Sequence, residues 1–132
     1  MSSQIIELAQ NVLKIEAEEI TKASQKLSNE FSEAIECILN CKGRIILSGI
    51  GKSGHIAGKI ASTFSSTGTP SFFMHPGEAS HGDLGMITEK DVVIFLSNSG
   101  ESQELMVLLP HIKRIGAKII SISGEANSTL SL

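Results

Sequence analysis

A strongly apolar run that passes into a polar turn and then into a helical pattern constrains the fold of this chain most. The run covers residues 91–96, the turn is Ser97-Asn98-Ser99-Gly100-Glu101-Ser102, and the helical pattern continues to Ile115. A buried strand followed directly by a helix is the repeating unit of parallel α/β sheets. The turn is therefore predicted to expose free backbone N–H groups and the positive end of a helix dipole.

The serines of this turn suit the binding of an anionic ligand. Helix N-termini bind phosphate through their backbone N–H groups, and serine hydroxyls add hydrogen-bond donors without bulk. A phosphate monoester is the expected ligand. The alternative is an ordinary helix start in which Asn98 and Glu101 form a capping pair.

Composition narrows the classes of function. The 132 residues are 41% hydrophobic, which predicts one domain with a proper core. A net charge of −3, with no basic cluster larger than Lys113-Arg114, argues against nucleic acid as a partner. No apolar run approaches the roughly 20 residues that span a bilayer, and no signal peptide is evident. With Cys37 and Cys41 expected to be reduced thiols, we predict a cytoplasmic protein without a membrane partner.

The N-terminal segment, residues 1–40, has helical periodicity. Its apolar residues recur in steps of three and four, with one step of five between Ile15 and Ile20. This predicts two amphipathic helices that break near Glu19 to Ser24. The apolar face either packs on the rest of the domain or contacts another subunit.

Residues 41–132 alternate between strand and helix patterns. Strands are expected at Arg44–Ser48, Thr69–Met74, Val92–Ser97 and Ala117–Ser121, with a helix to about Ser66 between the first two. This alternation predicts a doubly wound, three-layer α/β sandwich with a parallel sheet. In such sheets ligands bind beyond the carboxyl ends of the strands, where the polar motifs fall. Pro110 predicts a kink in the last helix, and Gly116 a stop.

A glycine-rich turn with a lysine, Gly49-Ile-Gly-Lys-Ser-Gly54, follows the first expected strand. It matches the dinucleotide fingerprint only formally, because no acidic residue closes the second strand, and it is not a Walker A loop. Lys52 at a helix start opposes the dipole, which marks it as a functional candidate. The alternative is a solvated surface lysine.

Histidines and carboxylates gather in residues 75–85. His75, Glu78, His81 and Asp83 permit a metal site, although a spacing of six between the histidines is not a structural-zinc pattern. Contact with sugar hydroxyls, proton transfer or a structural role are the alternatives for His81. Glu101 and Glu104 are expected in the first helical turn after the serines. They are either ordinary first-turn acids, or one of them is a base that acts beside Lys52.

Five segments together resemble sugar isomerase (SIS) domains, and more narrowly the arabinose-5-phosphate isomerase family. They are Gly51–His55, Thr63–Phe73, His75–Ala79, His81–Met86 and Ser97–Ser102. The resemblance implies a flavodoxin-like strand order and an interconversion of D-arabinose 5-phosphate and D-ribulose 5-phosphate through a cis-enediol. It also implies supply of Kdo for lipopolysaccharide or capsule, and a homotetramer with sites between subunits.

Residue roles follow from the same resemblance. Lys52 would stabilise the enediolate, and Glu104 would handle or position the proton. Zinc bound at His75 would be inhibitory rather than a required cofactor. Contact with the sugar phosphate is implied for Ser53, Gly68, Thr69, His81, Ser97, Asn98, Ser99 and Ser102.

The family continues beyond the point that corresponds to Leu132, with a further catalytic glutamate and histidine. We therefore expect an incomplete domain whose fourth strand has an exposed apolar edge. Three hypotheses result: an isomerase, a non-catalytic sugar-phosphate-binding module, and an inactive remnant that dimerises through its N-terminal helices.

Overall fold

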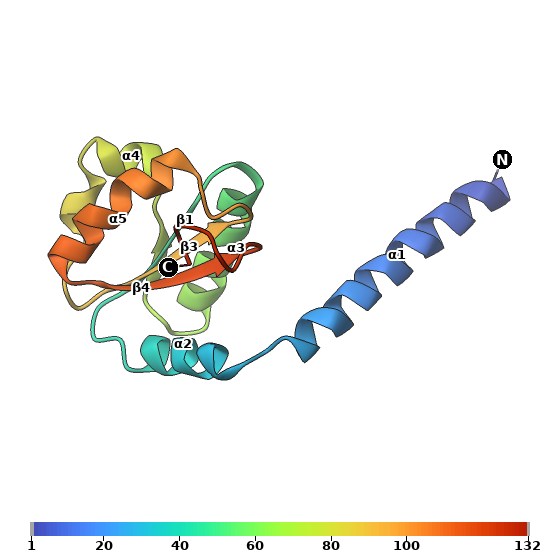
Figure 1. The fold of residues 1–132 in the computed structure, drawn as a ribbon, viewed down its shortest axis with the longest axis horizontal. Coiled ribbons are helices and arrows are strands. Elements are labelled where there is room, and N and C mark those ends of the chain that lie inside the picture. The colour runs from blue at the N-terminus through green and yellow to red at the C-terminus, as the bar shows by residue number, and fades with distance from the viewer. Residues whose placement is uncertain (1, 132) are drawn as a thin grey trace. The chain divides into compact units, whose positions relative to one another are not determined.

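The computed structural model describes residues 2–131, which form two compact units (Figure 1). The first unit ends at Ile35 and the second begins at Glu36. Helix α1 covers Ser2–Gln25, and α2 covers Asn29–Leu39. The apolar side chains of α1 are exposed, Leu8 at 65% and Val12 at 46%, so this helix does not bury its apolar face within its own unit.

The break between the two N-terminal helices was predicted too early. Helix α1 continues through Glu19–Ser24 and ends at Gln25. The step of five after Ile15 spans good helix formers, which keep the helix intact. The chain turns instead at Lys26–Ser28, where Ser28 precedes α2 and its carbonyl accepts the Phe31 N–H at 3.1 Å.

The second unit is built on a four-stranded parallel sheet. Its strands are β1 (Ile45–Gly49), β2 (Ser71–Phe73), β3 (Val92–Ser97) and β4 (Lys118–Ser123). Their order is β2-β1-β3-β4, so the predicted doubly wound, flavodoxin-like arrangement is confirmed. Every residue of β1 and β3 is buried, which explains why neither strand shows polar alternation.

Helices cover both faces of the sheet and complete three layers (Figure 1). Helix α3 (Gly51–Ser66) packs on one face, where Ala57 and Ala61 meet Ile45 and Leu47. Helices α4 (Pro76–Ser80) and α5 (Gln103–Ile115) cover the other face, and the short 3₁₀ helix η1 (Asp83–Met86) follows α4. The turn after β1 therefore leads to α3 on one face of the sheet, and the turn after β3 leads to α5 on the other face.

Helix α5 continues through Pro110 without a break, so the expected kink does not divide it. Pro110 is exposed, and water can satisfy the carbonyl that its missing N–H leaves free. The predicted stop is confirmed. Gly116 has φ +87° and donates its N–H to the carbonyls of Ile112 and Lys113.

Strand β4 forms an edge of the sheet among the described residues, as expected. Ile122 on this strand is 53% exposed, while Ile119 and Ile120 are half-buried. Residues 124–131 then turn back toward the end of β3, where Leu130 joins the core beside Leu105. We call residues 124–131 the strap.

Candidate functional site

The turns that follow β1 and β3 lie side by side at the carboxyl edge of the sheet. Gly49, the last residue of β1, pairs with Leu96 of β3. A Cβ on Gly49 would come within 2.9 Å of the Leu96 carbonyl oxygen, so the two strand ends approach too closely for a side chain. The sheet therefore brings residues 49–54 (the lysine turn) next to residues 97–102 (the serine loop).

The lysine turn presents the N-terminus of α3. A Cβ on Gly54 would lie 2.6 Å from the carbonyl oxygen of Gly49, so glycine lets the helix start directly against the strand end. Lys52 in the first turn is exposed, and Ser53 is half-buried. Because the first N–H groups of a helix have no intrahelical partners, this turn offers donors beside a fixed positive charge.

The serine loop is held together by its own hydroxyls. The Ser97 side chain, in a residue 5% exposed, accepts the Gly100 N–H at 3.1 Å and lies 3.1 Å from the Ser102 hydroxyl. The Ser99 hydroxyl accepts the Glu101 N–H at 3.2 Å. Ser97 and Ser102 thus form a close pair of hydroxyls below the start of α5, while Asn98 and Ser99 are exposed.

The alternative capping pair of Asn98 and Glu101 does not form. The Glu101 carboxylate accepts the backbone N–H of Thr129 at 2.6 Å, and the Asn98 carbonyl accepts the Gly124 N–H at 3.0 Å. Helix α5 begins at Gln103, directly after the serine loop, and Ser102 is a cap residue that makes no side-chain capping bond. Asn98 and Glu101 instead accept hydrogen bonds from the strap.

Glu104 lies in the first turn of α5, directly after the serine loop, and is exposed. Its carboxylate is therefore at the carboxyl edge of the sheet, as is Lys52. An exposed acid and an exposed lysine on neighbouring helix starts have the chemistry of a base and an electrostatic partner.

The two histidines flank α4. His75 caps this helix, since its Nδ1 accepts the Gly77 N–H at 3.1 Å, and its ring meets Phe73 edge to face at 6.4 Å. Nε2 is the ring nitrogen that this cap leaves for other partners. His81 follows the last residue of α4 and is exposed.

Gly68 and Thr69 are separated from the other predicted site residues. They follow the end of α3 and lead into β2, which places them at the amino edge of the sheet. The 16 residues of α3 span about 24 Å between this edge and Lys52. One chain therefore does not bring Gly68 and Thr69 to the serine loop.

Metal-binding chemistry is sparse in this chain. Within residues 2–131, no group of three His, Cys, Asp or Glu side chains is placed to hold a metal ion. Cys37 and Cys41 are free cysteines of intermediate exposure. His75 supplies one nitrogen, fewer than the three or four protein ligands that zinc usually takes.

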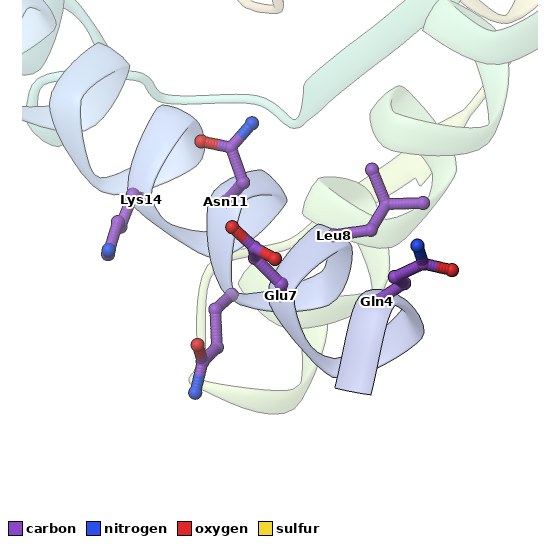
Figure 2. Close-up of a pocket in the computed structure, with 6 residues that line it drawn as sticks. Gln4, Glu7, Leu8, Asn11 and Lys14 are labelled. Carbon is purple, nitrogen blue, oxygen red and sulfur yellow. The ribbon is translucent and has the colours of Figure 1, made fainter. Parts of the chain in front are cut away.

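Three surface hollows contain none of the predicted site residues. Figure 2 shows one along α1, lined by Gln4, Glu7, Leu8, Asn11 and Lys14, whose side chains all project from this one helix. The others are about 260 Å³ beside Asp91 and about 240 Å³ between α5 and β4. The lysine turn and the serine loop thus lie outside these three hollows.

Two features of the molecule escaped the sequence analysis. Asp91, 2% exposed, accepts the N–H groups of Arg44 and Thr88, each at 2.7 Å. The available signal was that Asp91 and Arg44 each precede an apolar strand and so share the amino edge of the sheet. The second feature is the strap, whose contacts with the serine loop join residues far apart in sequence.

Comparison with known proteins settles the family. The SIS domain model matches residues 38–132. The chain belongs to the SIS domain family. This SIS domain is 53% identical over 119 residues to arabinose 5-phosphate isomerase KdsD of Yersinia pestis, which covers 90% of this chain and 36% of that protein.

Two solved structures share the fold. The E. coli CFT073 protein c3406, solved in complex with arabinose 5-phosphate, superposes with a TM-score of 0.94 at 41% identity, covering 99% of this chain and 70% of that one. A Bacteroides fragilis protein, named as a phosphosugar isomerase of capsule formation by assignment only, superposes with a TM-score of 0.86 at 41% identity, covering 96% of this chain and 68% of that one. Against the Yersinia pestis KdsD protein, by contrast, this SIS domain spans only 36% of the relative's length. None of the helices among residues 2–131 has the length and apolar character needed to cross a membrane.

Proposed function

We propose that this SIS domain carries the sugar-phosphate site of an arabinose-5-phosphate isomerase. The main support is that the hydroxyls of Ser97 and Ser102 lie 3.1 Å apart at the N-terminus of α5, next to the lysine turn. A helix N-terminus with hydroxyl donors suits a phosphate monoester. The 53% identity to a protein named arabinose 5-phosphate isomerase supports the choice of sugar. Kdo supply for lipopolysaccharide or capsule belongs to the same proposal.

The reaction needs a base and a cation at the reacting carbons. A carboxylate removes the proton from C2 of the open-chain aldose, and the electrons move to the aldehyde oxygen to give an enediolate. The enediolate oxygen O1 then takes up a proton while the O2 hydroxyl loses one, and C1 receives the proton that the carboxylate removed from C2, so the ketose forms without a net change in atoms. We assign the proton handling to Glu104 and the stabilisation of the oxyanion to Lys52.

Substrate contacts divide by their place in the fold. Ser53, Ser97, Asn98, Ser99 and Ser102 would hold the phosphate at the carboxyl edge. His81, exposed after α4, would contact the sugar. Gly68 and Thr69, at the opposite edge, can reach a substrate only when another copy of the chain supplies them.

A homo-oligomer is therefore part of the proposal. The exposed apolar residues Ile5, Leu8, Val12 and Ile15 recur along α1 in steps of three and four. Such a stripe suits burial against another helix. We propose that copies of the chain associate, as a tetramer, with sites shared between them.

Zinc enters the proposal as an inhibitor through Nε2 of His75. Because His75 is a single ligand, the remaining ligands would come from the substrate or from another copy. The reaction itself needs no metal in this scheme. The free thiols Cys37 and Cys41 support a reducing, cytoplasmic setting.

The test is an isomerase assay on the purified 132-residue chain with D-arabinose 5-phosphate, following D-ribulose 5-phosphate. Formation of the ketose at a rate proportional to protein concentration is the expected result. Saturable binding of the sugar phosphate without ketose would instead identify a binding module. The absence of both binding and turnover would reject the proposed site.

A further inference from the structure

The strap is joined to the serine loop by three backbone N–H groups. The Gly124 N–H donates to the Asn98 carbonyl at 3.0 Å, and the Leu130 N–H donates to the Gly100 carbonyl at 3.1 Å. The Thr129 N–H donates to the Glu101 carboxylate at 2.6 Å. Three positions around the loop, 98, 100 and 101, are therefore fixed from outside the loop.

The strap is itself anchored in the folded unit. Leu130 is 6% exposed and belongs to the core cluster with Leu105 and Leu108. Ser128 is 3% exposed, and its hydroxyl donates to the Glu125 carbonyl at 2.8 Å and lies 3.3 Å from the Ser123 hydroxyl. Side chains on both sides of Thr129 are thus buried, which holds its N–H in place.

The fit between strap and loop is close. Gly100 has φ +66°, and any Cβ there would overlap the Ser128 hydroxyl. Gly100 also donates its N–H to Ser97, one of the two paired hydroxyls of the loop. A displacement of the strap would therefore move Gly100, and Gly100 would in turn shift the Ser97 hydroxyl to which its N–H is bonded.

Of the three hydrogen bonds between the strap and the serine loop, only the one to Glu101 uses a side chain of the loop. The Thr129 N–H lowers the pKa of the Glu101 carboxyl below its ordinary value, so the acceptor is ionised at neutral pH. A bond from an N–H to a carboxylate is stronger than one between neutral groups. Glu101 is exposed, so its substitution removes this bond without opening the core.

We propose that Glu101 and Thr129 form a latch through which the strap positions the serine loop for phosphate. Glu101 is a positioning residue: it acts through the conformation of Ser97 and Ser102. The inference rests on the proposed function, because it assigns phosphate to that loop. A loop already fixed in its binding conformation loses less freedom when the ligand binds.

The experiment compares Glu101→Ala with Glu101→Gln, which keeps a side-chain oxygen as acceptor. Glu89→Ala is the matched control, because Glu89 is exposed and precedes β3 at the opposite edge. Calorimetry measures the Kd for D-arabinose 5-phosphate and for inorganic phosphate. We expect Glu101→Ala to raise both Kd values about threefold to tenfold, because the released loop must then be ordered when the ligand binds. Glu101→Gln should recover most of this loss, and Glu89→Ala should match the wild type.

Amide hydrogen exchange provides a readout that does not depend on any ligand. In Glu101→Ala, the N–H groups of Gly100, Thr129 and Leu130 should exchange faster, while those of β1 and β3 stay unchanged. Unchanged exchange at these three groups, or unchanged Kd values in a wild type that binds phosphate, would overturn the latch. A wild type that binds neither ligand would reject phosphate at this loop and with it both proposals, even where the exchange data show the mechanical link.

Discussion

The buried carboxylate of Asp91 accepts the backbone N–H of Arg44 at 2.7 Å, joining the segments that lead into β3 and β1. The same carboxylate accepts the Thr88 N–H at 2.7 Å and the Thr88 hydroxyl at 3.0 Å. The Arg44 guanidinium lies 3.6 Å away and stacks over the Phe72 ring at 5.1 Å. The Asp91 carboxylate thus links the segments that lead into β1 and β3, and the Arg44 side chain extends this contact to Phe72 of β2.

Acid should weaken the fold through Asp91. Burial alone would raise the pKa of this carboxyl, but the hydrogen bonds from Arg44 and Thr88 and the Arg44 charge together lower it below 3.8. Because the folded-state pKa is depressed, the stability it contributes is present above the unfolded value near 3.8 and is lost as pH falls through the folded pKa. Asp91→Asn should lower the free energy of unfolding at pH 7 by about 1–3 kcal/mol.

Urea unfolding at pH 7 and at pH 3 measures both effects. The loss of stability between these two pH values should be smaller in Asp91→Asn than in the wild type. Glu89→Gln, which removes an exposed charge nearby, is the control and should behave as the wild type. Equal acid sensitivity in Asp91→Asn and the wild type would show that Asp91 does not carry the effect.

Two glycines of α3 should respond oppositely to alanine. A Cβ at Gly54 would press within 2.6 Å of the Gly49 carbonyl, so Gly54→Ala should destabilise by about 1–3 kcal/mol. At Gly58 the nearest atom would be a Phe73 ring carbon at 3.9 Å, and Gly58→Ala should stabilise by about 0.5–1 kcal/mol. Thermal unfolding of the two variants measures the difference. Equal effects would mean that α3 shifts readily on the sheet.

The central strands were predictable from sequence because local pattern and burial agree there. Val92–Ser97 has the predicted bounds, and α3 ends at Ser66 as expected. Both segments are continuous in their apolar or helical pattern and are bounded by glycine or polar turns. The N-terminal break was misplaced because a gap in apolar periodicity does not stop a run of good helix formers.

The strap contacts were beyond prediction from sequence. Glu101 and Thr129 are 28 residues apart, and their bond uses a backbone N–H, which carries no residue identity. The separation of Thr69 from Lys52 is likewise a property of the fold. Sequence motifs show that residues share a function, but only the strand order shows which edge each one occupies.

Lys52 should matter to turnover through its place, not its charge alone. Lys52→Ala should lower kcat about 10²–10³-fold, the loss typical for removal of one group that stabilises an oxyanion. Lys59→Ala is the matched control, because Lys59 is also an exposed lysine of α3 but lies two turns further on. Steady-state kinetics with D-arabinose 5-phosphate measure both. Equal losses in the two variants would point to general electrostatics.

Zinc inhibition should depend on His75. Since Nδ1 of His75 accepts the Gly77 N–H, Nε2 is the expected ligand atom. His75→Ala should raise the zinc concentration for half-inhibition by at least about tenfold, in the range lost with a metal-site residue. His111→Ala, an exposed histidine of α5, should leave it unchanged. A chelator should restore the wild-type rate, and equal zinc sensitivity in both variants would exclude His75.

A complementation experiment tests whether one site draws on two copies of the chain. Thr69 lies at the amino edge of the sheet and Lys52 at the carboxyl edge, so a shared site takes them from different chains. Thr69→Glu should repel the sugar phosphate, and Lys52→Ala should lack the stabilising cation. Each variant alone should keep no more than about 1% of the wild-type rate. The two variants are refolded together as a 1:1 mixture. Half of the sites then receive an intact Lys52 and, independently, half receive an intact Thr69, so about a quarter of the sites receive both and about a quarter of the wild-type rate should return. Sites contained within one chain would gain nothing from mixing, so a mixture as inactive as its components would reject the shared site.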